Sequence, residues 1–233
     1  DEAAAKEWLL TSDQEVEDYL YSLSADRLAP LMGNAGIRMS VFPHLYKDGE
    51  VIPEEGFDTK NYNDVPLLLV TGTSEFSLFT AFDKRFAASV SDGSLFKDEN
   101  LLKEFAYAET YGSQLYRLSN TVESARIMTE HYNSPIYISQ ISFGDDGTSA
   151  PTVAGLLGAF HGVFEPLLQT PSNYATFIGD DFESAGAKEL SKDFKAYLKQ
   201  FLSTGDPNGD DLPKWEAWTA SNQEVLSMDA DLK

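Results

Sequence analysis

Apolar side chains form two short runs that are typical of buried β-strands. Residues 65–70 read VPLLLV without polar alternation and lead into Thr71 and Gly72, and residues 135–143 are rich in β-branched and aromatic side chains. A continuous apolar run favours a strand that is covered on both faces, as in a parallel sheet. The pattern therefore predicts two strands of a parallel sheet.

Other parts of the chain have the spacing of amphipathic helices. Apolar residues recur at helix-like intervals over residues 1–31, they are interleaved with charges over 75–133, and they line one face of a helix expected over 188–202. Strands alternating with helices indicate the α/β class. We expect a helical and irregular lead-in over residues 1–60, followed by a strand-and-helix region over 61–233.

Composition narrows the possible partners. The 233 residues include 17 Lys and Arg against 38 Asp and Glu, a net charge of −21, and 42% of them are hydrophobic. Enough apolar material for a core excludes a disordered acidic tail, and the charge repels phosphate backbones, so we expect no nucleic-acid partner. No apolar run is long enough to predict a membrane span. The absence of cysteine excludes disulfides and thiolate nucleophiles but indicates no compartment.

Candidate chemistry begins with the histidines. His44 follows a proline in a loop and His131 ends a helical segment, so we interpret both as structural or surface residues. His161 lies in the stretch GAFHG, where small neighbours let an imidazole approach other groups. Glu75 follows the first apolar run, and the carboxyl ends of parallel strands are where catalytic groups gather. Considered alone, however, Glu75 is better interpreted as a solvated loop acid, one of 38 acidic residues.

A serine nucleophile is not evident in the chain. The elbow pattern Gly-x-Ser-x-Gly never occurs, and its nearest approximation, FESAG around Ser184, has Phe182 where the first glycine belongs. We therefore expect Ser184 to lie in a loop that leads into a helix. The histidines are also far apart in sequence and show no His-x-x-x-His spacing, which disfavours a metal-dependent hydrolase.

Four segments resemble, in the right order, the C-terminal portion of the type-B carboxylesterases, the cholinesterase-like branch of the α/β-hydrolases. They are YKDGEVIP at 46–53, NDVPLLLVTGTSEFSLF at 63–79, GAFHG at 158–162, and STGDPNG at 203–209 with LPKW at 212–215. The resemblance implies the C-terminal part of an α/β-hydrolase fold, with an incomplete, mostly parallel sheet flanked by helices.

The same resemblance assigns roles to two side chains. It implies that Glu75 is the acid of a catalytic triad and that His161 is the general base and acid, with Phe76 standing where the family commonly has glycine. The family's nucleophile and oxyanion-hole glycines lie in its N-terminal part. We therefore expect part of a serine carboxylesterase that hydrolyses carboxylic esters, needs neither cofactor nor metal, and is inactive alone.

The resemblance also suggests partners and one alternative. The expected partners are the missing N-terminal half of the same protein and a small-molecule ester, and an exposed sheet edge could support self-association. The alternative is a non-catalytic relative of the neuroligin type, which keeps the fold as a binding or adhesion module. Retention of both Glu75 and His161 favours the enzyme, because a binding module does not need the pair.

Overall fold

A computed structural model describes residues 1–32, 46–143, 153–169 and 183–229. The chain divides into two compact units, Asp1–Tyr46 and Lys47–Lys233. His44 and the polar loop expected over 144–151 lie outside the described residues. The division at residue 60 that the sequence suggested stays a prediction.

The first unit contains the helices expected over residues 1–31. They are α1 (Glu2–Leu9), α2 (Gln14–Ser22), α3 (Ala25–Leu28) and the 3₁₀ helix η1 (Ala29–Met32). Asp13 caps α2 by accepting the backbone N–H of Val16 at 3.1 Å, which satisfies one of the free donors at a helix start. Val16 is buried, and the rings of Trp8 and Tyr19 pack edge-on with centroids 5.2 Å apart.

The second unit is built on a three-stranded parallel sheet. Its strands are β1 (Leu67–Gly72), β2 (Ile136–Ile141) and β3 (Leu226–Met228), in the order β1-β2-β3. Leu67 pairs with Ile136 in the first ladder, and Ser139 pairs with Leu226 in the second. Both expected strands and their parallel arrangement are confirmed, as is the α/β class. The sequence did not predict β3.

A set of hydrogen bonds holds the starts of β1 and β2 at the same level. The Asp64 carboxylate accepts the side-chain N–H of Asn133 at 2.7 Å and the backbone N–H of Ser134 at 2.7 Å. The Ser134 hydroxyl donates in return to the Asp64 carbonyl at 3.0 Å. Asp64 therefore joins the two segments that enter neighbouring strands.

Helices surround this sheet. They are α4 (Ser77–Phe82), α5 (Ala87–Ser91), the 3₁₀ helix η3 (Ser94–Lys97), α6 (Glu99–Arg117), the π-helical turn η4 (Leu118–Val122), α7 (Glu123–Met128), α8 (Val153–Leu157), the 3₁₀ helix η5 (His161–Val163), α9 (Phe164–Leu168) and α11 (Ala185–Thr204). The helical character expected over 75–133 and 188–202 is confirmed, and Gly205, in the left-handed region, ends α11 as expected.

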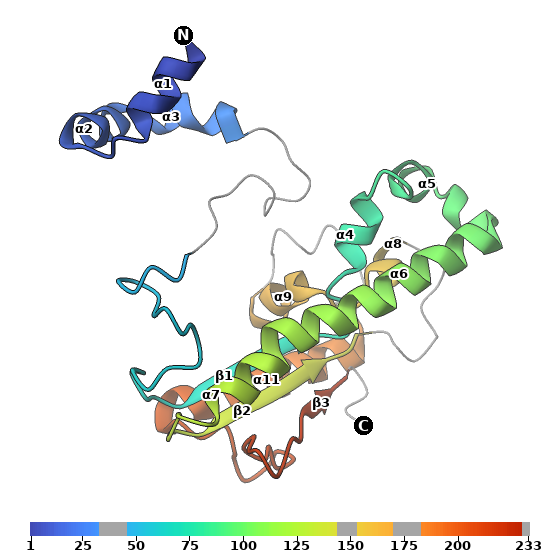
Figure 1. The fold of residues 1–233 in the computed structure, drawn as a ribbon. Helices are drawn as coiled ribbons and strands as arrows, with labels where there is room; N and C mark the ends of the chain where they lie inside the picture. The colour runs from blue at the N-terminus through green and yellow to red at the C-terminus, as the bar shows by residue number, and fades with distance from the viewer. Residues whose placement is uncertain (33–45, 144–152, 170–182, 230–233) are drawn as a thin grey trace. The chain divides into compact units, whose positions relative to one another are not determined.

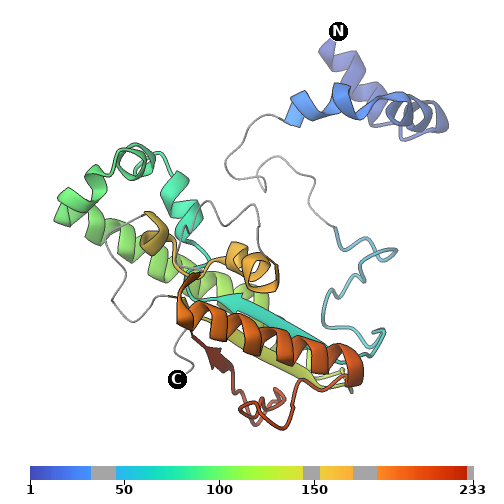
Figure 2. The same cartoon turned by 180° about the vertical axis from the view of Figure 1, so that it is seen from behind.

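The strands are covered on both faces. On β1, Leu68 and Val70 pack into the larger core with side chains of α11, while Leu67 and Leu69 pack on the opposite side with α7 and Trp218. Figures 1 and 2 show the sheet between the α6–α7 layer and α11 from two opposite directions. This two-sided burial explains why the strand residues are apolar without alternation.

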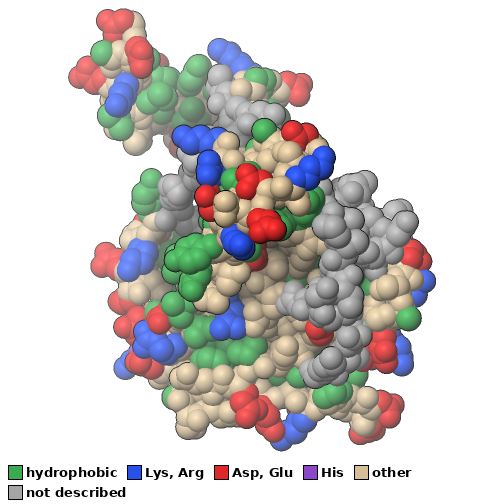
Figure 3. All heavy atoms as spheres, turned by 90° about the vertical axis from the view of Figure 1, so that its right-hand side faces the viewer, with side chains coloured by type: hydrophobic (Ala, Val, Ile, Leu, Met, Phe, Trp, Pro, Cys, Tyr) green, Lys and Arg blue, Asp and Glu red, His purple; other side chains and the backbone are tan. Residues whose placement is uncertain are grey.

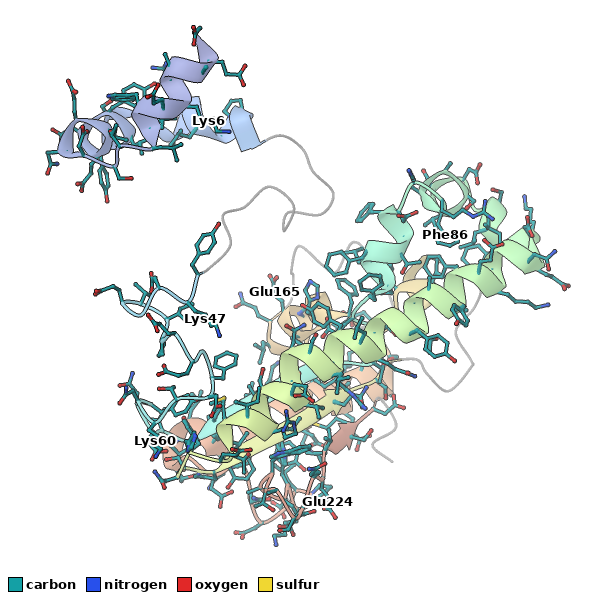
Figure 4. All side chains as sticks on the ribbon, in the orientation of Figure 1. Lys6, Lys47, Lys60, Phe86, Glu165 and Glu224 are labelled. Carbon is teal, nitrogen blue, oxygen red and sulfur yellow. The ribbon has the colours of Figure 1, made fainter. Side chains whose placement is uncertain are left out.

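Aromatic side chains tie the helices to the sheet and to one another. The indole of Trp215, which is 1% exposed, donates from Nε1 to the carbonyl of Ile138 on β2 at 2.9 Å. Tyr197 of α11 meets the Trp215 ring edge-on. At the far end of α6, the ring of Phe86, labelled in Figure 4, stands edge-on against Phe105 with centroids 5.3 Å apart. These contacts link α11 to β2 through Trp215, and the start of α5 to α6.

The surface carries the excess of acidic groups without gathering them into one patch on the face in Figure 3, where Asp and Glu side chains occur at several separate places. Within the described ranges, no helix combines the length and the apolar character needed to cross a bilayer.

Candidate active site

Glu75 and His161 meet at the carboxyl end of β1. Glu75 lies in the short turn between β1 and α4, and His161 is the first residue of η5. Although 86 positions separate them, Glu75 Oε2 lies 2.8 Å from His161 Nδ1. The structure therefore brings together the two side chains that the sequence singled out, with the spacing of a hydrogen bond.

Three N–H groups converge on the buried Glu75 carboxylate. Oε1 accepts the backbone N–H of Gly72 at 2.7 Å, and Oε2 accepts the backbone N–H of His161 at 3.0 Å in addition to facing Nδ1. A carboxylate only accepts hydrogen bonds, so the imidazole nitrogen that faces it carries the proton. In the neutral imidazole the lone pair is consequently on Nε2.

Burial is distributed unequally within this pair. The Glu75 side chain is 3% exposed, whereas the His161 side chain is 42% exposed. A buried charge needs compensation, and the converging N–H groups supply it for Glu75. The exposed His161 can take a proton from, or give one to, a group arriving from outside, which is what a general base and acid must do.

The segment that carries Glu75 interlocks with the segment that carries His161. The backbone N–H of Ser74 donates to the carbonyl of Ala159 at 2.9 Å, and the hydroxyl of Ser77 donates to the carbonyl of Leu157 at 2.6 Å. A Cβ atom on Gly72 would lie 1.9 Å from the Ala159 oxygen, so only glycine permits this approach. The sequence thus builds two loops that fix each other.

Aromatic rings surround the imidazole and the carboxylate. Phe160 stands edge-on to the His161 ring at 5.7 Å between centroids, and Phe79 of α4 lies 6.5 Å away. Tyr116 of α6 contacts Phe79 with centroids 6.5 Å apart. Partial burial, and secondarily the negative charge of Glu75, raise the pKa of Tyr116 above its usual value. Tyr116 therefore stays neutral beside the carboxylate.

The remaining side chains considered from the sequence lie in structural settings. Ser184 is the N-cap of α11 and accepts the backbone N–H of Ala187 at 3.2 Å, so the expectation of a helix-leading position is confirmed. His131 follows α7, and its Nε2 lies 3.1 Å from Asp58 Oδ1.

One group of the described residues has donor atoms close enough to approach a metal ion. Asp58, Glu130 and His131 each offer a ligand atom, and these atoms lie within 4.8 Å of one another. Both carboxylates are exposed, and the direct contact between His131 and Asp58 already accounts for the imidazole. Sequence reasoning missed this group because Asp58 and His131 are 73 positions apart and share no local motif.

Glu75 and His161 thus lie at the carboxyl end of a strand in a parallel sheet, the edge at which ligand-binding groups gather in open α/β sheets. No protein-family model matches the chain, and no curated protein matches it by sequence. Solved structures do match. A PNB esterase structure gives a TM-score of 0.62 at 17% identity, and another gives 0.61 at 20%; each match covers 99% of this chain and 50% of that chain.

A third match is carboxylesterase EST55 from Geobacillus stearothermophilus, with a TM-score of 0.53 at 21% identity over 92% of this chain and 46% of that chain. These likenesses show that the chain has the fold of type-B carboxylesterases. The chain spans about half the length of these structures.

Proposed function

We propose that this chain supplies the acid and the general base of a serine carboxylesterase that hydrolyses carboxylic esters. The observation that carries the proposal is the contact of 2.8 Å between the buried Glu75 carboxylate and Nδ1 of the exposed His161. The esterase fold of the solved structures adds to its support.

The chemistry follows from the two nitrogens of the imidazole. Nε2 of His161 takes the proton of a serine hydroxyl as its oxygen attacks the ester carbonyl, and the resulting imidazolium is stabilised by Glu75. The same proton then passes to the departing alcohol, which leaves an acyl group on the serine. In the second half of the cycle, His161 activates water in the same way and the acyl-enzyme is hydrolysed.

The nucleophile in this proposal comes from polypeptide outside these 233 residues. The chain contains no Gly-x-Ser-x-Gly elbow, and Ser184 is engaged as a helix cap. We therefore expect the chain alone to hydrolyse esters no faster than background, since the elbow serine and the oxyanion donors supply most of the rate enhancement.

The outer edge of β1 is the place where we propose that the complementary polypeptide adds a parallel strand. Leu67 N–H and Thr73 N–H point toward β2, so by alternation Leu68 and Val70 direct their backbone groups outward. Within the described residues no strand pairs with that edge. The residues of β1 include no charged side chain and no proline that would discourage pairing. In addition, β1 is packed on both faces like an internal strand.

This edge makes the partner testable without an activity assay. Sedimentation is measured first for the chain alone and then for the chain co-expressed with the proposed complementary polypeptide, which compares two possible partners of the β1 edge. We expect a one-to-one complex in the co-expressed sample. The chain alone would form a homodimer if it associates through this edge, and the complementary polypeptide would then dissociate that homodimer. A homodimer that persists unchanged would contradict the proposed partner.

Activity is tested by single substitutions in the complete protein with a short-chain nitrophenyl ester. His161→Ala should lower kcat about 10³-fold or more with little change in KM, because the general base acts in the transition state. His131→Ala and His44→Ala are matched controls and should leave kcat near that of the unsubstituted protein. If His161→Ala retains more than about a tenth of kcat, the proposed function is wrong and the non-catalytic alternative gains support.

A further inference from the structure

Helix α6 contacts the acid-bearing turn through a buried serine. The hydroxyl of Ser113, which is 2% exposed, accepts the backbone N–H of Phe76 at 2.9 Å. Phe76 directly follows Glu75 in the chain but lies 37 positions from Ser113. The bond thus joins the middle of a long helix to the peptide next to the carboxylate.

The direction of this bond is fixed by a second one. Ser113 Oγ lies 3.0 Å from Glu109 Oε1, one helical turn earlier, and donates its hydroxyl proton to it. With its proton committed to Glu109, the Ser113 oxygen is left with lone pairs directed at the Phe76 N–H. The order of donation is therefore from Phe76 to Ser113 and from Ser113 to Glu109.

Gly112, the neighbour of Ser113, lets the turn approach the helix. A Cβ atom on Gly112 would lie 2.3 Å from Cδ1 and 2.5 Å from Cγ of Phe76, which is far inside van der Waals contact. Glycine weakens a helix interior relative to alanine, so its presence inside α6 has a packing reason here. The ring of Phe76 occupies the space that a side chain would fill and continues toward Phe79 at 5.4 Å between centroids.

We propose that Ser113 and Gly112 are positioning residues that fix the direction of the Glu75 carboxylate toward His161. The catalytic meaning of this role rests on the proposed function. Glu75 is held from the β1 side by the Gly72 N–H and from the other side by the peptide that Ser113 anchors. Loss of that anchor lets the turn rotate, and a misdirected carboxylate no longer selects the Nδ1–H form of the imidazole.

The test is made on the purified chain by ¹⁵N NMR of the His161 ring, assigned with a His161→Gln variant. In the unsubstituted chain we expect the two ring nitrogens to resonate as a fixed Nδ1–H tautomer. In Ser113→Ala we expect the two resonances to move toward each other as the tautomers interchange. Ser119→Ala is the matched control, because in the described part of the chain its exposed hydroxyl bonds to the carbonyl of Tyr116, three residues earlier, and it should change nothing.

A merely structural role gives a different result. If Ser113→Ala lowers the unfolding midpoint but leaves the His161 tautomer fixed, the positioning role is wrong. Gly112→Ala displaces the same turn because the added Cβ clashes with the Phe76 ring, so it should produce the same spectral change in the folded fraction. If both variants fold and neither alters the ring signals, the proposal is overturned.

In the complete protein, Ser113→Ala should lower kcat by about tenfold to a hundredfold while KM changes less than about twofold, since misorientation acts mainly on the reacting geometry. The spectral readout needs no ester turnover, so the two proposals fail separately. A complete protein that hydrolyses no ester would refute the proposed function, while a tautomer shift in Ser113→Ala would still support the positioning role.

Discussion

The substitution Glu75→Gln tests, on this chain alone, the hydrogen bonds that the Glu75 carboxylate accepts. It keeps the size of the side chain and replaces one acceptor oxygen by an NH₂ group. Three N–H groups converge on the two oxygens of Glu75, from Gly72, from the backbone of His161 and from its Nδ1. We expect a clear loss of stability, because the amide has only one oxygen with which to accept them.

Both orientations of the amide leave a donor without an acceptor. If the amide oxygen faces His161, the NH₂ group opposes the Gly72 N–H across 2.7 Å. If it faces Gly72, the NH₂ group can donate to Nδ1 only in the other imidazole tautomer, and the backbone N–H of His161 is left unpaired. An unpaired buried donor costs about 1–3 kcal/mol, and the remaining bonds weaken when the acceptor is neutral, so we expect a total of about 2–4 kcal/mol.

Urea denaturation followed by circular dichroism measures this loss as a lower midpoint at unchanged slope. Glu104→Gln is the control, since Glu104 pairs with Arg85 at 2.7 Å while both side chains are about half exposed, and such surface pairs contribute at most about 1 kcal/mol. If Glu75→Gln destabilises no more than Glu104→Gln, the three acceptor contacts at Glu75 do not hold the fold together and the geometry of the site is wrong.

Two further predictions concern the sheet. Hydrogen bonds from the Asn133 side chain and the Ser134 backbone hold the pKa of Asp64 below its usual 3.8. Its stabilising contribution is therefore complete above that value and is lost as the pH falls through the lowered pKa. Asp64→Asn should reduce the melting temperature more at pH 7 than at pH 2. A reduction that is equal at both values would contradict the assignment. Trp215→Phe should cost about 1–3 kcal/mol in urea unfolding, because it removes part of a buried ring together with the N–H that donates to the Ile138 carbonyl. In Trp218→Phe the lost indole N–H has no partner in the described part of the chain, so the cost should be smaller; equal costs would show that the Trp215 hydrogen bond contributes little.

The main strands could be predicted because their burial is two-sided. In β1 every residue from Leu67 to Val70 contacts one of the two cores, so the sequence carries an unbroken apolar run. The three-residue strand β3 could not be found in this way, because Leu226–Met228 is too short to display any period. Its place in the sheet depends on β2, which lies 85 or more positions away in sequence and offers no local signal.

The same contrast between local and long-range signals applies to the residues of the candidate site. His161 could be proposed from its small neighbours. Glu75 is one acid among 38 in the sequence; its position after the first apolar run made it a candidate, and the family resemblance decided in its favour. What makes Glu75 different is the set of N–H groups that reach it from β1 and from η5. Such convergence is a property of the folded chain. Ser113 was overlooked for the same reason, since its partner is a backbone N–H on another element.

The described contacts also indicate how much of the proposed active site is formed before any nucleophile is present. All the hydrogen bonds given above for the Glu75 carboxylate come from residues of this chain, and the adjoining peptide is anchored on α6 by Ser113. Fixed hydrogen-bonding groups lower the reorganisation needed during a reaction. Under the proposed function, the complementary polypeptide has to bring its serine hydroxyl within reach of Nε2 on the exposed side of His161. It does not have to create the acid–base pair, because β1, η5 and α6 already hold it.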